Sequence, residues 1–182
     1  LGWRGGVTGN VGDETDGRNG ALLWVDSTTG DHGVLASGVR NAFDGVWVDG
    51  HGYVFTDNGR DLEFDHPPEE LNFLIEGAAY GWPDDDPEHP VPVGTEAPIG
   101  TWAPHTSMNG IDVRPVHSSL PGLEPSDGFT IYATVYGSWH TILPQGHAIV
   151  RIYGTGLTDG VYSSNIQRSA LATRTPLPFV FA

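Results

Sequence analysis

Two stretches far apart in this 182-residue chain share one pattern, and this repetition constrains the fold more than any other feature. Residues 20–39 and 146–166 each contain a glycine, an apolar run, a Thr-Gly turn, a Gly-Val pair and a second run. Residues 44–59 likewise resemble residues 109–115 and 127–139, which a long loop separates. The order along the chain is an outer strand pair, an inner pair and an outer pair again, which predicts one structural unit used repeatedly.

The repeated runs have the length and composition of β-strands, because they are short and rich in β-branched and aromatic residues. Asp-Gly-His-Gly at 49–52 predicts a tight hairpin between two of the runs. The chain has 26 glycines and 14 prolines, which favours many turns and an all-β protein. The predicted strands are residues 21–26, 45–50, 53–57, 71–76, 110–115, 129–136 and 148–153.

Repeated four-stranded antiparallel units predict β-propeller blades, because one small sheet cannot cover both of its own faces. The repeats account for about two to three blades, whereas a closed ring generally needs four or more. We therefore expect residues 1–182 to form a partial propeller domain, with a two-sheet sandwich as the alternative. An incomplete ring exposes apolar end faces, so we expect it to associate with the remainder of a propeller or with itself.

Charge and composition exclude several classes of function. The net charge of −15 gives no electrostatic support to nucleic-acid or anionic-membrane binding. All eight Lys and Arg positions are arginine, which excludes Schiff-base lysine chemistry and a P-loop lysine. The chain has no cysteine for a nucleophile or a zinc ligand, and no apolar run approaches the ~20 residues that cross a bilayer.

Arg40 and Asn41 precede the predicted inner strand 45–50, where a propeller strand begins near the mouth of the central channel. A guanidinium binds a carboxylate through two hydrogen bonds, and an asparagine amide both donates and accepts. The pair is therefore a candidate site for an anionic ligand. The alternative is a surface arginine that caps a loop carbonyl.

Asp57, Asn58, Gly59 and Arg60 follow the next predicted strand and so return to the same rim. A glycine in a tight polar loop leaves backbone carbonyls available, and Ca²⁺ prefers carbonyl and carboxylate oxygens. These four residues are candidate calcium ligands, and a plain Asn-Gly turn is the alternative. Two further acidic runs, 61–71 and 84–89, lack the EF-hand spacing and are expected to be solvated loops.

His105 precedes the predicted strand 110–115 much as Arg40 precedes 45–50, so in a propeller both lie on one rim. A structural hydrogen-bonding histidine is the alternative. Ser138 and Trp139 close the matching inner pair and are candidates for the same mouth. No Gly-x-Ser-x-Gly elbow accompanies these residues, so a serine hydrolase is not indicated.

The segments that hold these candidates resemble one known family. LASGVRNAFDGVWVDGHGYVFTDNGRD at 35–61 and PPEELNFLIEGAAYGWP at 67–83 are similar to the glucose/sorbosone dehydrogenase family of soluble quinoproteins. PHTSMNGIDVRP at 104–115 and IYATVYGSWHTILPQGHAIVRIY at 131–153 resemble later segments of that family. The resemblance implies a six-bladed propeller that binds pyrroloquinoline quinone (PQQ) through Ca²⁺ and oxidises a sugar or alcohol, with an electron acceptor as second partner.

The resemblance also implies residue roles. Arg40 and Asn41 would hold the carboxylate and quinone oxygens of PQQ, and His105 would contact the cofactor. The carbonyls of Gly59 and Arg60 would ligate calcium, with Asp57 or Asn58 in support. The family's members are mostly periplasmic or secreted, which is the location expected here.

The catalytic base of the family lies upstream of the Arg-Asn segment, and no histidine precedes His32 in this sequence. We therefore expect the general base to come from outside this chain, and the chain to be poorly active alone. A catalytically silent propeller module that binds a protein or glycan is the main alternative function. A calcium-dependent lactonase-type hydrolase is a third.

Overall fold

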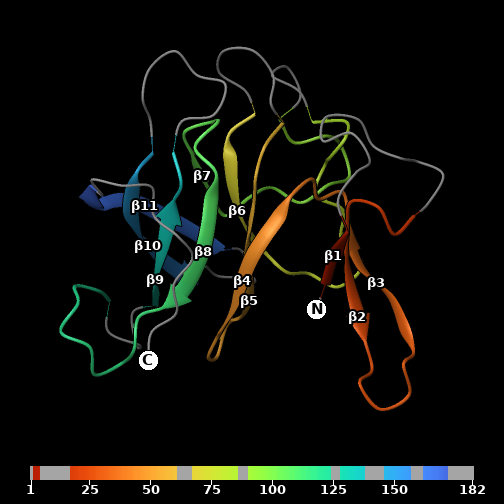
Figure 1. The fold of residues 1–182 in the computed structure, drawn as a ribbon, viewed down its shortest axis with the longest axis horizontal. Coiled ribbons are helices and arrows are strands. Elements are labelled where there is room, and N and C mark those ends of the chain that lie inside the picture. The colour runs from red at the N-terminus through yellow and green to blue at the C-terminus, as the bar shows by residue number, and fades with distance from the viewer. Residues whose placement is uncertain are drawn as a thin grey trace.

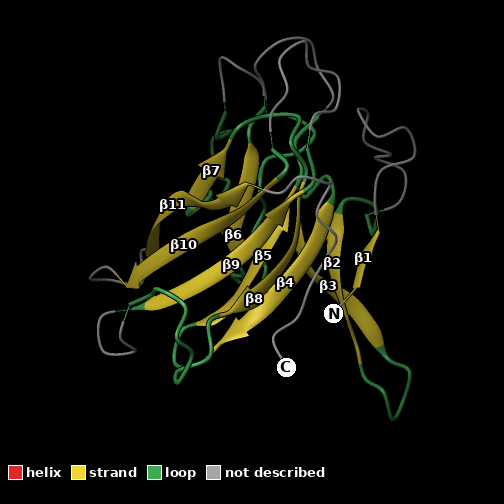
Figure 2. Cartoon of the chain, turned by 60° about the vertical axis from the view of Figure 1, so that its left-hand side comes forward, coloured by secondary structure: helices red, strands yellow, loops and turns green. Residues whose placement is uncertain are grey.

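The computed structural model describes residues 2–4, 17–60, 67–85, 90–123, 128–137, 146–156 and 162–171. Every regular element in these ranges is a β-strand (Figure 2). The strands are β1 (Gly2–Arg4), β2 (Ala21–Val25), β3 (His32–Ser37), β4 (Ala42–Val48), β5 (Gly52–Asp57), β6 (Glu69–Phe73), β7 (Gly100–Trp102), β8 (Met108–Val113), β9 (Phe129–Val135), β10 (Ala148–Gly156) and β11 (Tyr162–Leu171).

The strands form three antiparallel sheets that follow one another in chain order (Figure 1). The sheets are β1-β2-β3, β4-β5-β6-β7 and β8-β9-β10-β11, each with sequential strands as neighbours. The first strands of the two four-stranded sheets, β4 and β8, lie against each other. This arrangement confirms the prediction of an all-β protein made of propeller blades, and the two-sheet sandwich is wrong.

The repeated sequence patterns correspond to repeated positions in the blades. The outer pairs are β2–β3 and β10–β11, and the inner pairs are β4–β5 and β8–β9. Both inner pairs also carry a shift in register at the same end, between Ala42 and Gly45 in β4 and between Met108 and Ile111 in β8. Such bulges re-aim the chain locally and are common next to functional sites.

Two apolar clusters hold the blades together, and the sheet β4–β7 lies between them. Val54 and Leu71 pack with residues of β8, β9 and β10, while Phe55 packs with residues of β2 and β3 on the opposite face. Each fully buried aliphatic or aromatic side chain contributes about 1.5–3 kcal/mol. Because both faces of β5 are covered, its polar last residues, Thr56 and Asp57, are buried as well.

Polar contacts join the inner strands of neighbouring blades. The Asp44 carboxylate accepts the backbone N–H of Ile111 at 3.1 Å, and the Thr56 hydroxyl lies 3.4 Å from the Asn109 carbonyl. These contacts fix β4 relative to β8 near the end of the blades where the candidate residues lie.

One sequence expectation about loops was wrong, and one strand was not expected. β7 lies within the Pro-rich segment 77–105, which shows no strand periodicity. The acidic run 61–71 is described only from residue 67 onward, and its Glu69 is a buried residue of β6 instead of a solvated one. Among the described residues, no helix is long and apolar enough to span a membrane.

Candidate functional site

The two ends of the β4–β5 hairpin meet at one rim. The antiparallel register pairs Ala42 with Asp57, so the residues before β4 lie beside those after β5. The backbone N–H groups of Arg40 and Asn41 donate to the Asp57 carboxylate at 2.9 and 2.5 Å. The Asn58 N–H donates to the Asn41 carbonyl at 3.1 Å. The structure thus brings together the predicted anion-binding pair and the predicted calcium loop.

The Arg40 side chain turns toward the same loop. Its Nη1 donates to the carbonyl of Asn58 at 3.2 Å and to the carbonyl of Gly59. Two backbone oxygens of the loop therefore point at one positive group. A Cβ on Gly59 would lie 2.7 Å from the Pro67 carbonyl, so the loop needs glycine here to keep this path.

Several buried side-chain atoms at this end have no hydrogen-bond partner within the part of the chain that the structure describes, among them atoms of Asn58 and His105. Asn58 is 4% exposed, and neither its Oδ1 nor its Nδ2 has a hydrogen-bond partner there. His105 is 5% exposed, and its Nε2 has no partner among the same residues. An unsatisfied buried polar group costs about 1–3 kcal/mol, and most such groups in native proteins are paired. Exceptions of this kind call for a partner beyond the described residues, such as a water molecule, an ion or a ligand.

Glu69 connects the loop to the turn that contains His105, and sequence reasoning did not select it. Its Oε2 accepts the Gly59 N–H at 3.1 Å, and its Oε1 accepts the N–H groups of Thr106 and Ser107 at 2.9 and 3.0 Å. Only the Glu-Glu pair in the segment that resembles the quinoprotein family could have drawn attention to it.

Burial perturbs the carboxyl groups around this rim. It raises the pKa of Asp57 to about 7, although the N–H groups of Asn41 and Arg40 oppose the shift. Burial also raises the pKa of Glu69 to about 7 and that of Glu70 to about 8, where the nearby Asp57 charge adds to the effect. Clustered carboxyls with raised pKa values are typical of functional sites. A cation bound nearby would favour their ionised forms.

A small cavity lies under the loop, lined by Arg40, Asp57, Asn58, Gly59, Pro68, Glu70, Tyr80, Trp82 and Asp85. The Arg60 Nε lies 3.9 Å from the Asp85 Oδ1 across this region. The loop carbonyls, the Asn58 amide and the carboxyls around them provide the oxygen-rich surroundings that a hard cation prefers. No group of three or more His, Asp or Glu side chains within the described ranges is arranged to hold a metal by itself.

The remaining predicted residues, Ser138 and Trp139, lie outside the described residues. The strand end that precedes them is held at the His105 turn, because the Tyr136 N–H donates to the Ser107 carbonyl at 2.9 Å. The Gly137 N–H donates to the Thr106 carbonyl at 2.8 Å. The contact of Ser138 and Trp139 with a cofactor stays a prediction.

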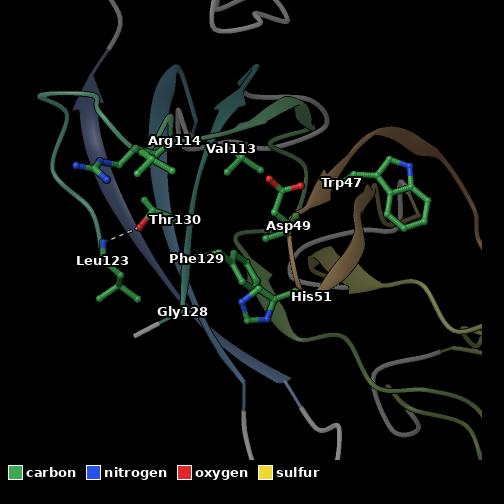
Figure 3. Close-up of a pocket in the computed structure, with 11 residues that line it drawn as sticks. Trp47, Asp49, His51, Val113, Arg114, Leu123, Gly128, Phe129 and Thr130 are labelled. Atoms are coloured by element: carbon green, nitrogen blue, oxygen red, sulfur yellow. Dashed lines mark hydrogen bonds between the residues drawn. The ribbon is translucent and has the colours of Figure 1, made fainter. Parts of the chain in front are cut away.

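A larger cavity of about 190 Å³ lies at the other end of the β4–β5 hairpin (Figure 3). Its lining includes Asp49 and His51, and the His51 ring stands edge-on to Phe129 at a centroid distance of 5.2 Å. The Thr130 hydroxyl in its wall accepts the Leu123 N–H at 2.8 Å. None of the residues singled out from the sequence lines it.

No family model and no curated protein matches the chain. Several solved structures do match. The PQQ domain of pyranose dehydrogenase from Coprinopsis cinerea, in its holo form, aligns with a TM-score of 0.64 and 16% identity, covering 94% of this chain and 53% of that one. The PQQ-bound aldose sugar dehydrogenase from Streptomyces coelicolor aligns with a TM-score of 0.54 and 19% identity, covering 83% and 39%.

A third structure, a glucose dehydrogenase, aligns with a TM-score of 0.51 and 21% identity, covering 85% of this chain and 45% of that one. The chain therefore spans about half or less of each of these proteins. The alignments establish its fold: it has the propeller-blade arrangement found in part of the PQQ-dependent sugar dehydrogenases. At the level of fold, this confirms the resemblance seen in the sequence.

Proposed function

We propose that this chain supplies one side of the PQQ and calcium site of an enzyme that oxidises a sugar or an alcohol. One observation carries the proposal: Arg40, Asn41, the loop 57–60 and the His105 turn gather at one end of adjacent blades. They do so in a fold shared with solved structures that bind PQQ. When bound, PQQ supplies a hydride acceptor, and Ca²⁺ polarises its reactive carbonyl.

The residues at the rim fit these groups. Asn58 and His105 present buried polar atoms that have no partner among the described residues, and a bound ligand would satisfy them. The Asn58 and Gly59 carbonyls already converge on the positive Arg40 guanidinium, as they would on a cation. The surrounding carboxyls favour a positive charge at this position.

The roles follow from the chemistry of each group. Arg40 and Asn41 would hold the carboxylate and quinone oxygens of the cofactor. The Gly59 and Arg60 carbonyls would ligate calcium, with Asn58 beside them. Cofactor binding would then replace the contacts of Arg40 with the loop carbonyls by contacts with a carboxylate.

Asp57 has a different principal task. Both of its carboxylate oxygens accept N–H groups from Arg40 and Asn41, so it shapes the rim while adding negative charge near the cation. His105 and the predicted Ser138 and Trp139 would border the cofactor on the neighbouring blade. The general base, the sugar-binding surface and the contact with the electron acceptor would come from the remainder of the propeller.

Residues 1–182 would accordingly be part of a larger propeller domain that is periplasmic or secreted, as the family resemblance suggests. Within the described residues the sheet β1-β2-β3 has three strands where its neighbours have four, and the apolar end faces of an incomplete ring would favour association with further blades. Gel filtration of the isolated chain should show self-association. A compact, stable monomer would contradict this part of the proposal.

Titration of PQQ into the full-length protein in the presence of Ca²⁺ tests the function. We expect quenching of tryptophan fluorescence and dye-linked oxidation of sugars, both of which Arg40→Ala should abolish. Arg18→Ala, which removes the same charge from an exposed position, is the matched control. No PQQ binding at any calcium concentration would refute the proposal, and calcium-dependent glycan binding without PQQ would favour the silent module.

A further inference from the structure

Glu69 hydrogen-bonds both the Asn58–Arg60 loop and the His105–Ser107 turn. It lies at the start of β6 and is 3% exposed. The loop follows β5 in the same blade, whereas the turn precedes β8 in the next blade. A single carboxylate therefore spans two blades through three backbone N–H donors.

The turn has a backbone conformation that needs such support. His105 and Ser107 have φ values of 58° and 52°, in the left-handed region that side chains with a Cβ disfavour. Conformations of this kind persist where surrounding contacts hold them. The Glu69 Oε1 accepts two consecutive N–H groups of the turn, and these hydrogen bonds support its conformation.

The other oxygen acts on the loop in a comparable way. The Glu69 Oε2 holds the Gly59 N–H, on the residue whose carbonyl faces Arg40. The position of that carbonyl and the position of the His105 ring thus both depend on where one carboxylate lies. A change at either end moves the acceptor that serves the other end.

We propose that Glu69 is a positioning residue that couples the Asn58–Arg60 loop to the His105–Ser107 turn, so that a cation bound by the loop also orders His105. The coupling between loop and turn exists without a ligand. The part that concerns the cation rests on the proposed function. By linkage, ordering the turn would in the same measure strengthen cation binding by the loop.

Glu69→Gln in the full-length protein should remove the hydrogen bond to the loop and keep those to the turn, because a glutamine side chain has one acceptor oxygen and one NH₂ group. The oxygen should face Thr106 and Ser107, which offer two donors, and the NH₂ group should then face the Gly59 N–H. Hydrogen–deuterium exchange read by mass spectrometry should show Gly59 exchanging about tenfold faster, with a smaller change in the turn. Glu69→Ala should accelerate both regions, and the exposed Glu76→Gln should accelerate neither.

Exchange in β9, a strand of the neighbouring blade, distinguishes a positioning role of Glu69 from an effect on overall stability. Unchanged exchange at Gly59, Thr106 and Ser107 in both Glu69 variants would overturn the proposal. So would an equal acceleration throughout β9, because that result describes only a loss of overall structure.

Added Ca²⁺ tests the cation part separately. In the wild-type protein, Ca²⁺ should slow exchange in both the loop and the turn, whereas in Glu69→Gln it should slow only the loop. Slowing in both regions of Glu69→Gln would overturn the coupling. If Ca²⁺ slowed neither region of the wild-type protein, the proposed function would fail, while the variants measured without calcium would still decide the role of Glu69.

Discussion

Glu70 offers a test of whether ionising a buried carboxyl at the rim lowers the stability of the chain. Its carboxylate accepts a hydrogen bond from the Asn72 amide at 3.1 Å, and it lines the small cavity under the Asn58 loop. Burial, with the nearby charge of Asp57, raises its pKa from 4.5 to about 8. Glu70→Gln keeps the shape of the side chain and an oxygen for Asn72 but removes the charge.

The sign of the effect follows from proton linkage. Because the pKa is raised in the folded chain, the contribution of Glu70 to stability is fully present below about pH 4.5. It is lost as the pH rises through about 8. One pKa unit corresponds to about 1.4 kcal/mol, so the loss has an upper limit of roughly 5 kcal/mol. Partial contact with solvent reduces it, and we expect about 2 kcal/mol.

Urea unfolding followed by tryptophan fluorescence, with a chelator present, measures this effect. At pH 8.5 Glu70→Gln should unfold at a higher free energy than the wild-type chain, by about 2 kcal/mol, and at pH 4.5 the two should agree. The exposed Glu76→Gln serves as the control and should match the wild-type chain at both pH values. If Glu70→Gln were less stable than wild type at pH 8.5, or kept the same pH dependence, the reasoning about buried charge would be refuted.

Three further outcomes test the fold and the site. Leu71→Ala removes a fully buried side chain between two blades and should cost about 2–5 kcal/mol in urea unfolding; a cost below 1 kcal/mol would mean that the blades do not pack as described. Gly38→Ala should lower the melting temperature more than Gly30→Ala. Both glycines have left-handed φ values, but of the two only a Cβ on Gly38 would meet backbone, at 2.8 Å from the Tyr80 nitrogen. Equal decreases in melting temperature would argue against that contact. Chelation of calcium from the PQQ-loaded protein should reduce the free energy of unfolding by about 3 kcal/mol if calcium had been present at roughly 100 times its Kd. The same chelation should reduce the free energy of unfolding of Arg40→Ala much less.

The strand pattern could be predicted because its signal is local. Runs such as 129–136 alternate in a short-range pattern, and β9 occupies Phe129–Val135 of that run. The repetition of whole units then indicated blades. β7 could not be predicted, since three residues inside a Pro-rich segment carry no periodicity and become a strand only by pairing with β6.

The residues of the candidate site also differ in how far the sequence predicts them. Arg40, Asn41 and the loop 57–60 could be brought together from the sequence because one hairpin connects them, and antiparallel pairing determines that its ends meet. Glu69 could not be identified, because its role depends on two N–H groups of another blade. Its charge favoured a solvated position, and only the tertiary structure supplies the three donors that make burial possible.

The location of calcium tests the central claim most directly. Crystals of the full-length protein grown with PQQ and Ca²⁺ would reveal the ion by its anomalous scattering. We predict a calcium ion about 2.3–2.6 Å from the carbonyl oxygens of Gly59 and Arg60, with PQQ on Arg40 and Asn41. A calcium ion and PQQ bound together at another place, with this loop still closed on Arg40, would contradict this prediction.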